Sequence, residues 1–532
     1  MSETPDIREA PENPDRLKED ARKESQAKLE DPPRSLELVG WFVYGLCSYF
    51  VYTVLIPILF PLLIVQRASL TSDLPPPPAY TSRGVVCSPD EMTLYQRLIN
   101  HSIKVDGAKF SPLQWTASSW AAGILLTGPI LPHAAHYLDQ GEGQSIVLGG
   151  ATAIAAFSCL LTGFFKTTWL FPVFIAVIAV ATTVGTTAHS RNLGLMIRGH
   201  TAHVAGKDHF PRRRAAASWL SLFCTTGGSI GAAIIAAFTY HMLRRSDKLT
   251  SLWVVSIFSG LMLSVGICHA FSCRPAPPSS ARSSAKCAHF IAIATYPHAI
   301  GSLIAVLFSS FSSMCIFTSG TLYIIGDLCI KPVMLLSLWM IYFIFPMFSL
   351  PTLHPVQLIM RADAVSMQLL GFFMSAFTSG LGFYYKDKKW EPVHMVLVVL
   401  LQSTAAGVLH AFGRVLLLDC SPAGKEGAFS AWLAWVKAAG AFAGFAAGSA
   451  APGNAGKAFG AAFLGSFVGV VVLIFGNVSN LGGVVAAGHV KEEEREDGTP
   501  ACGLDRVGDG ENGVGGSSNS GEMSGGQEKG GV

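Results

Sequence analysis

Residues 416–450 of this 532-residue chain read LLLDCSPAGKEGAFSAWLAWVKAAGAFAGFAAGSA. A short polar turn at residues 419–426 precedes an apolar segment that is long enough to cross a bilayer as a helix. Lys437 stands near the middle of this segment, where an ammonium group costs several kcal/mol unless it faces protein, a partner charge or water. The alternative is that Lys437 extends to the membrane interface and has no functional role. We favour a position on a polar pathway inside a bundle of membrane helices.

The same segment carries a glycine at every fourth position, at Gly440, Gly444 and Gly448. Small residues at this spacing line one face of a helix and let the backbone of another helix approach closely. We therefore predict that this helix packs tightly against a neighbouring helix.

The composition is that of a membrane protein. Hydrophobic residues make up 50% of the chain and charged residues only 14%, and the mean hydropathy is +0.42. The net charge of +3 is small and its basic residues are spread over many loops, which argues against nucleic-acid binding. The eleven cysteines show neither C-x-x-C spacing nor the density of a disulfide scaffold.

The apolar segments predict an all-α integral membrane protein with twelve transmembrane helices, because a span needs about 20 apolar residues. The expected spans are residues 39–65, 115–135, 145–165, 168–187, 215–241, 250–271, 299–325, 332–353, 364–385, 393–418, 427–449 and 456–475. An even number of spans places both termini on one side of the membrane.

The distribution of lysine and arginine indicates which side that is. Segments on the side of the termini hold 23 of the 38 Lys and Arg residues, and the loops on the other side hold 14. The positive-inside rule therefore favours cytosolic termini. The sequon at Asn100-His101-Ser102 then lies in a non-cytosolic loop, where Asn100 is a candidate for glycosylation.

Three parts of the chain are expected to lie outside the helical bundle. The N-terminal tail (residues 1–37) and the C-terminal tail (479–532) are polar and predicted to be disordered and cytosolic. The loop at 66–114 is long, and we favour a disordered insertion over a lid. Cys87 in this loop and Cys329 are expected on the same face of the membrane. A disulfide between them is one alternative, but we favour two free thiols.

The chain also repeats itself. A shift of 213 residues superposes similar positions within the fifth span of each half: Ala215 on Ala428, Trp219 on Trp432, Leu220 on Leu433, Gly227 on Gly440 and Gly231 on Gly444. Matching the first span of each half needs a larger shift, and the excess is close to the length of the loop at 66–114. The alternative is a chance match between helices rich in alanine and glycine. Two parallel six-helix halves, 38–272 and 290–478, joined by a cytosolic linker at 273–289, describe the major facilitator architecture.

A loop after the second span resembles a motif of the major facilitator family. Here Ala135-His-Tyr-Leu-Asp139-Gln-Gly141 places a small residue four positions before an aspartate, and a glycine follows it. The resemblance implies that Asp139 caps a helix and holds a cytosolic gate by charge pairing. Basic residues that usually follow the aspartate are missing here, so its partner is expected to be Arg191 or a member of Arg212–Arg214.

The second half contains an equivalent of this loop at Arg361-Ala-Asp363, where an arginine is adjacent to the aspartate. We therefore expect Arg361 and Asp363 to belong to the gate as well.

The stretch Pro422-Ala-Gly424-Lys425-Glu426-Gly-Ala-Phe429 is more specific. It resembles the vacuole effluxer branch of the major facilitators, which is linked to autophagy, in its Pro-x-Gly-basic-Glu-x-x-Phe pattern and its later lysine. The Gly-Trp at Trp41 in the first span is similar too. This resemblance implies roles for Gly424, Lys425 and Glu426 at the gate, an endomembrane location such as the vacuole, and efflux of small amino acids.

The tenth span ends with further candidates. His410 and Arg414 are one helical turn apart, and Asp419 follows. Histidine titrates near neutral pH, which makes His410 a candidate for a proton pathway together with Lys437. A salt bridge from Arg414 to Asp419 or Asp363 at the gate is an alternative.

Other chemistry has little support in the sequence. His200, His203 and His209 share a predicted loop without a cysteine or carboxylate cluster, so we expect solvated side chains and no metal site. We find no Gly-x-Ser-x-Gly, His-Glu-x-x-His or Walker motif, so we expect neither an enzyme nor a cofactor.

The sequence predicts a secondary transporter, with the lipid bilayer and a small solute as partners and with proton coupling as a hypothesis. The alternatives are a carrier of an organic anion or sugar, and a membrane sensor or scaffold that has lost transport and binds unknown cytosolic partners through its tails.

Overall fold

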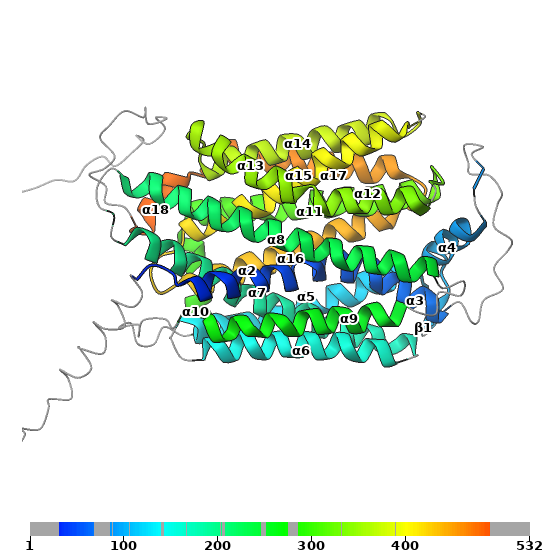
Figure 1. Ribbon diagram of the computed structural model, residues 1–532, viewed down its shortest axis with the longest axis horizontal. Helices are drawn as coiled ribbons and strands as arrows, with labels where there is room; N and C mark the ends of the chain where they lie inside the picture. The colour runs from blue at the N-terminus through cyan, green and yellow to red at the C-terminus, as the bar shows by residue number, and fades with distance from the viewer. Residues whose placement is uncertain are drawn as a thin grey trace, which may run out of the picture. The chain divides into compact units, whose positions relative to one another are not determined.

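The computed structural model describes residues 31–68, 86–87, 89–105, 107–139, 143–165, 167–202, 204, 208–245, 252–274, 286–330, 332–388 and 390–489. Gly141, most of both predicted tails and most of the predicted linker lie outside these residues. Nearly everything that is described is helical (Figure 1). A helix satisfies its own backbone N–H and C=O groups, which the hydrocarbon of a bilayer cannot do.

The first six spans form what we call the N-half. Its helices are α2 (Ser35–Ser48) with η1 (Val51–Leu59) and α3 (Phe60–Ala68), α5 (Pro112–Asp139), α6 (Gln144–Phe164), α7 (Phe171–Thr201) after a short η2 (Thr168–Leu170), α8 (His209–Arg245), and α9 (Leu252–Val265) with η4 (Gly266–Ser272). The segment η1 is a π-helix with Pro57 inside it. Such wider turns are common where a helix borders a functional site.

The last six spans form the C-half. Its helices are α11 (Pro297–Gly326), α12 (Pro332–Ile344) with α13 (Pro346–Ile359), α14 (Ala364–Tyr384), α15 (Pro392–Asp419), α16 (Glu426–Ala450) and α17 (Ala455–Phe475). Each of the twelve predicted spans overlaps one helical segment. Among the described residues, eleven segments are long and apolar enough to cross a membrane. The remaining one, α5, has 28 residues and packs between α7 and α16.

The two halves are built alike and meet through equivalent helices. Within the halves, α6 packs on α7 and α9, and α14 packs on α15 and α17. The fifth helix of each half crosses to the other: α8 packs on α12, α13 and α15, and α16 packs on α5 and α7. In Figure 1, α13, α14, α15 and α17 lie at one edge of the bundle, α6 and α9 lie at the other, and α8 and α16 lie between them.

Glycines in α8 and α16 hold equivalent positions. A Cβ atom at Gly231 would stand 2.0 Å from the carbonyl oxygen of Leu46 in α2, and one at Gly444 would stand 2.3 Å from the carbonyl oxygen of Phe311 in α11. Either contact excludes any side chain. The glycines are 213 positions apart and the residues that they meet are 265 apart. The excess of 52 positions is close to the length of the loop at 66–114, as expected for a duplication with one insertion.

The other glycines of the repeat lie on the same two helix pairs. The nearest atom to a Cβ at Gly227 is the carbonyl oxygen of Phe42, and at Gly440 it is the carbonyl oxygen of Leu307, which is again 265 positions later. A Cβ at Gly448 would stand 2.9 Å from the Cβ of Thr318. Four of the five glycines therefore lie where two helices are in close contact, and Gly227, with its nearest atom at 3.8 Å, lies in an ordinary van der Waals contact.

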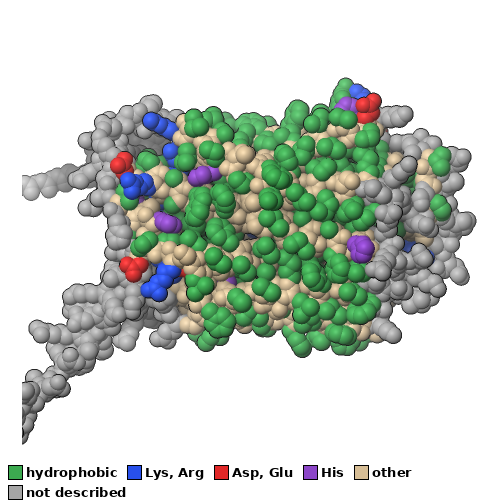
Figure 2. All heavy atoms as spheres, in the orientation of Figure 1, with side chains coloured by type: hydrophobic (Ala, Val, Ile, Leu, Met, Phe, Trp, Pro, Cys, Tyr) green, Lys and Arg blue, Asp and Glu red, His purple; other side chains and the backbone are tan. Residues whose placement is uncertain are grey.

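The surface fits a bilayer. In Figure 2, apolar side chains cover the middle of the visible face and the charged side chains lie toward its two ends. Large apolar side chains are exposed on helices of both halves: Leu125, Leu126, Phe157, Phe373, Phe377, Leu464 and Phe467. Burial in lipid accounts for this exposure.

The long loop is not a disordered insertion in its described part. It contains helix α4 (Pro89–Ile99) and a hairpin of strands β1 (Ile103–Val105) and β2 (Ala108–Phe110). Met92, Tyr95 and Leu98 are buried at a helical spacing, so α4 packs through one apolar face. Asn100 follows α4 and is exposed.

The preference for free thiols is wrong as well. Cys87 and Cys329 form a disulfide with a Cα–Cα distance of 5.2 Å. The bond joins the loop of the N-half to the connection between α11 and α12 in the C-half. Packing of α4 against α11, where the ring of Tyr95 lies beside Gly326, brings the two cysteines together.

Two more predictions need correction. The C-terminal tail begins with a short helix, α18 (Asn480–Ala486), which Ser479 caps by accepting a hydrogen bond from the backbone N–H of Gly482. Helix α7 continues to Thr201, well beyond the predicted end at residue 187. The residues of this extension pack between the two halves. Their polar side chains therefore do not mark the end of the helix.

Candidate functional site

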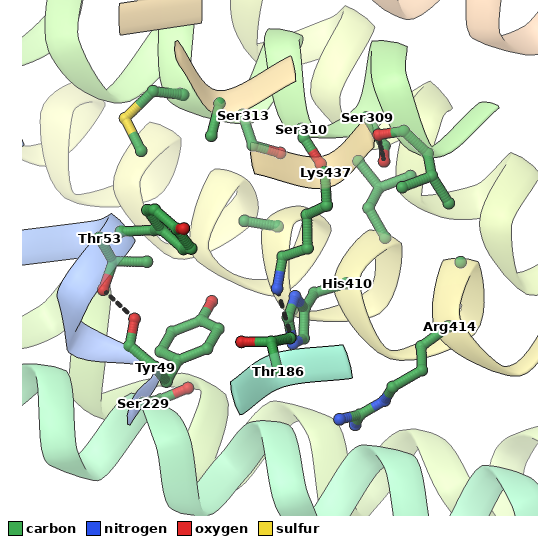
Figure 3. A pocket seen from close by; sticks show the side chains of 18 of the residues that line it. Tyr49, Thr53, Thr186, Ser229, Ser309, Ser310, Ser313, His410, Arg414 and Lys437 are labelled. Atoms are coloured by element: carbon green, nitrogen blue, oxygen red, sulfur yellow. Dashed lines mark hydrogen bonds between the residues drawn. The ribbon is translucent and has the colours of Figure 1, made fainter. Parts of the chain in front are cut away.

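A cavity of about 140 Å³ lies between the two halves. Its walls come from the first, fourth and fifth spans of the N-half and from four spans of the C-half, those of α11, α12, α15 and α16. Hydroxyl groups from both halves face it, among them those of Tyr49, Ser229, Ser309, Ser310 and Ser313 (Figure 3).

Lys437 and His410 meet in this cavity. The Lys437 Nζ lies 3.4 Å from the His410 Nε2 and 5.9 Å from the centre of the Tyr49 ring, while the His410 ring packs edge-on against the same tyrosine. The ammonium therefore lies inside the bundle rather than at the membrane interface. A neutral imidazole can accept a hydrogen bond from it, whereas protonating both groups at this distance would be costly.

Arg414 also lines the cavity, one turn after His410 on α15. Its Nε and Nη2 donate to the Ser221 Oγ at 3.1 and 2.9 Å, and its Nη2 also donates to the Ser221 backbone oxygen at 3.0 Å. A longer contact of 3.9 Å joins its Nη1 to the Cys224 Sγ. Both residues belong to α8, so Arg414 links the C-half to the N-half through uncharged acceptors.

The alternative of a salt bridge from Arg414 to Asp419 or Asp363 is contradicted by the structure. Asp419 pairs instead with Arg213 of α8, whose Nε donates to its Oδ1 at 2.8 Å, and both side chains are buried. Residues five positions apart on a helix point about 140° from each other. Arg414 and Asp419 therefore face different parts of α8.

Asp363 has another role in the structure. Its Oδ1 accepts a hydrogen bond of 2.9 Å from the backbone N–H of Ser366 and so caps α14. Arg361 adopts a positive φ of 52°, and its backbone oxygen accepts a hydrogen bond of 2.6 Å from the Nη1 of Arg214. This second loop therefore contacts the N-terminal end of α8.

Asp139 caps the first turn of α16 from the other half. Its Oδ1 accepts a hydrogen bond of 2.6 Å from the N–H of Gly427, and its Oδ2 accepts one of 3.1 Å from the N–H of Ala428. A carboxylate at a helix N-terminus is favourable because unpaired N–H groups and the helix dipole meet it there. A Cβ at Gly427 would stand 2.7 Å from the carboxylate oxygen, so the contact requires glycine.

Two basic side chains complete the surroundings of Asp139. The His289 Nε2 lies 2.8 Å from its Oδ2, and the Arg191 Nε lies 3.8 Å from its Oδ1. Of the expected partners, the structure places Arg191 there. His289 belongs to the short helix α10 (Lys286–Ile291), which precedes the C-half.

The motif at residues 422–429 lies at the same end of the bundle. Glu426 forms an ion pair with Arg198 of α7 and accepts a hydrogen bond of 2.9 Å from the N–H of Gly424. Gly424 has a φ of 79°, which only glycine adopts readily. The Lys425 Nζ lies 5.7 Å from the centre of the Tyr296 ring. Glu426 thus joins the halves, while Gly424 and Lys425 shape the turn before α16.

Several partners in this network were missed from the sequence: Arg198, Ser221 and His289. Arg213 was expected as a partner of Asp139, but it pairs with Asp419. Arg191 and Arg198 are seven residues apart, which places them on one face of a helix. This spacing could have shown that α7 continues. Which carboxylate each arginine meets depends on how the halves pack, and no spacing in the sequence shows that.

Comparisons by sequence find nothing: no family model matches the chain, and no curated protein does. Solved structures are similar in fold. A bacterial homologue of the iron transporter ferroportin, in an outward-facing state, is 12% identical with a TM-score of 0.53 over 84% of this chain and 99% of that one. The human organic anion transporter MFSD10 (TETRAN) is 13% identical with a TM-score of 0.51 over 83% of this chain and 100% of that one. The predicted fold class is confirmed: the chain has the major facilitator fold.

Proposed function

We propose that this chain is a secondary active transporter that moves a small solute across a membrane by alternating access. The observation that carries the proposal is the cavity between the halves, which has Lys437 and His410 in its wall. A central cavity at the interface of two repeats is where transporters with this architecture bind their solutes. The halves that would move against each other are residues 38–272 and 290–478.

The contacts at one end of the bundle act as the gate in this mechanism. Asp139 joins α5 to α16, Arg213 pairs with Asp419, and Arg198 pairs with Glu426, each across the two halves. These contacts must break for the cavity to open at that end. A solute that binds the open and closed states with different affinity would shift the balance between them.

We assign the gate to the cytosolic side. The distribution of lysine and arginine favours cytosolic termini, and the gate lies at the end of the bundle where α2 begins. The disulfide and the exposed Asn100 lie in loops that this topology places on the opposite side. Disulfides persist in oxidising compartments, which agrees with a lumenal or external position for those loops.

The solute is proposed from resemblance. The motif at residues 422–429 resembles the vacuole effluxers and supports small amino acids as the solute and an endomembrane as the location. The similarity in fold to an organic anion transporter supports a second candidate, an organic anion. Lys437 and His410 are the groups through which proton coupling would act.

Counterflow in proteoliposomes tests the proposal. The purified protein would be reconstituted with an unlabelled solute inside, and uptake of labelled alanine, lactate or glucose would be followed at two internal pH values. We expect saturable uptake of at least one solute that is lost in Lys437→Met. The matched control is Lys457→Met, since Lys457 is exposed at the start of α17. Absence of counterflow for all three from folded protein would favour the sensor or scaffold alternative.

A further inference from the structure

The cavity is lined by positive charge without a matching negative charge. Lys437 and Arg414 both face it, and no described Asp or Glu is among the residues that line it. Within the described residues, these two cations contact uncharged groups: the His410 imidazole, Ser221, the Cys224 thiol, the Tyr49 ring and the Trp41 ring, whose centre lies 5.3 Å from the Arg414 Cζ. Buried charges in proteins are normally paired. This cavity therefore lacks a counter-charge.

We propose that the cavity binds its solute through a carboxylate or another single anionic group held between Lys437 and Arg414. The inference rests on the proposed function and names the class of solute. His410 connects the two cations, since its ring is 3.4 Å from the Lys437 Nζ and one helical turn from Arg414. The Cβ atoms of His410 and Arg414, one turn apart on α15, are about 5–6 Å from each other, so an anionic group beside the His410 ring would lie near both cations.

Both cations have donors left for such a group. A guanidinium carries five N–H groups, and the Arg414 contacts with Ser221 and Cys224 leave part of Nη1 unused. An ammonium carries three N–H groups, and His410 takes one from Lys437. In Figure 3 both side chains extend from the C-half toward the helices of the N-half. An anion between them would contact both halves.

The rest of the cavity wall suits a solute that carries no charge apart from its anionic group. The wall also contains the aromatic ring of Tyr49 and the hydroxyl-bearing side chains of Tyr52 and Ser229. A zwitterion would bring an ammonium group, and the described wall offers no carboxylate to receive it. An anion without a positive charge therefore fits better than an amino acid.

The volume limits the size of the solute. An apolar cavity of about 150 Å³ holds benzene, which has six heavy atoms, and this cavity measures about 140 Å³. Lactate, lactamide, alanine and glycerol each have six heavy atoms and differ in charge. They form a matched series of an anion, a neutral amide, a zwitterion and a polyol.

Binding to the purified full chain in detergent tests the inference without requiring transport. Thermal unfolding would be followed at pH 7 against each of the four compounds to obtain a Kd. We expect lactate to bind at least tenfold more tightly than lactamide, alanine or glycerol. Equal affinities, tighter binding of alanine, or no binding of lactate would overturn the inference.

Variants identify the groups that hold the anion. Lys437→Met and Arg414→Gln are each expected to raise the Kd for lactate at least tenfold, while Lys437→Arg keeps a cation and is expected to raise it less. The exposed Lys457→Met is the matched control with unchanged Kd. If either charge removal leaves lactate binding unchanged, the proposed site is wrong. The comparison of the four compounds in the unmodified chain remains decisive even if a variant does not fold.

Transport measured beside binding separates the two proposals. Lactate binding that depends on Lys437 and Arg414, without counterflow of lactate, alanine or glucose, would support the anion site and contradict the transporter. Counterflow of alanine or glucose without lactate binding would support the transporter and contradict the anion site.

Discussion

At the scale of single residues, His410 holds the Lys437 ammonium in position inside the cavity. It accepts a hydrogen bond from Lys437, and its ring packs against Tyr49. A hydrogen bond to a charged group contributes about 1.5–3 kcal/mol. Holding the ammonium in place is therefore a role that is distinct from binding the solute.

Replacing His410 tests this role. We expect His410→Leu to lower counterflow about tenfold or more, because a loss of about 1.5 kcal/mol corresponds to a factor of ten. His410→Gln offers an amide oxygen as acceptor and is expected to recover most of the activity. Equal activity of the two variants, measured in the same proteoliposome assay, would mean that the hydrogen bond to Lys437 has no effect.

His489 makes the stability depend on pH. It lies beyond α18, and its Nε2 lies 2.8 Å from the backbone oxygen of Ser421. Burial, together with the nearby Arg213 and Arg198, lowers the pKa of His489 to about 2. An exposed histidine has a pKa of about 6.5, so the unfolded chain binds a proton below that pH that the folded chain excludes. The free energy of unfolding of the protein therefore decreases as the pH falls below about 6.5.

The measurement is thermal unfolding in detergent between pH 7.5 and 5.5. We expect His489→Gln, whose amide can still donate to Ser421, to lose less stability than the unmodified chain, by about 1 kcal/mol per pH unit below 6.5. The prediction fails if both proteins show the same dependence on pH.

At the scale of helices, close contact between α16 and α11 depends on glycine. A Cβ at Gly444 would overlap the backbone oxygen of Phe311, whereas a Cβ at Gly320 of α11 would meet nothing within 4 Å. We expect Gly444→Ala to destabilise the protein by about 1–3 kcal/mol, since the helices must move apart. Gly320→Ala is the matched control and is expected to be neutral or slightly stabilising. Equal unfolding temperatures for the two variants would contradict this view of the helix pair.

The spans could be predicted from sequence because each depends on a property of its own residues. The length of an apolar segment is enough to indicate a membrane helix, and the glycine spacing in α16 indicates a close neighbour. Helix α4 was missed because it is short and amphipathic, and only its packing on α11 shows that it is ordered. The extension of α7 was missed because its buried arginines look like loop residues in the sequence.

Only part of the candidate site could be predicted from the sequence, because some of its contacts depend on how the two halves pack against each other. Lys437 and His410 were recognised because polar groups inside apolar helices are unusual. Asp139 was recognised through its motif, but its position at the start of α16 depends on how the halves meet. The alternative salt bridge from Arg414 to Asp419 was wrong because it rested on closeness in sequence and did not consider the direction in which the two side chains point around the helix.

At the scale of the whole molecule, Arg213 and Asp419 tie the two halves together at the gate. Both are buried, so removing one leaves the other charge without a partner. Breaking such a pair costs about 3–5 kcal/mol, whereas replacing both residues by apolar ones can be nearly neutral. Opening the gate would separate these two buried charges, which is costly. The pair therefore favours the closed gate even though it adds little to the net stability of the fold.

A double-mutant cycle checks this. We expect Arg213→Met and Asp419→Leu each to lower the unfolding free energy by about 3–5 kcal/mol, and the double variant to lose less than either. Arg212→Met is the matched control, because Arg212 is exposed beside Arg213. Additive losses in the double variant would show that the two side chains do not stabilise each other.

The central claim is that one cavity is reached in turn from both sides of the membrane. Ser313 lines that cavity, so Ser313→Cys reports on access when the exposed Cys268 and Cys287, and Cys224 in the same cavity wall, are replaced by serine. A membrane-impermeant maleimide would be applied to each side of oriented proteoliposomes, with the parent that keeps Ser313 as control. We expect labelling of this cysteine from both sides. Labelling from one side only, or from neither, would contradict alternating access.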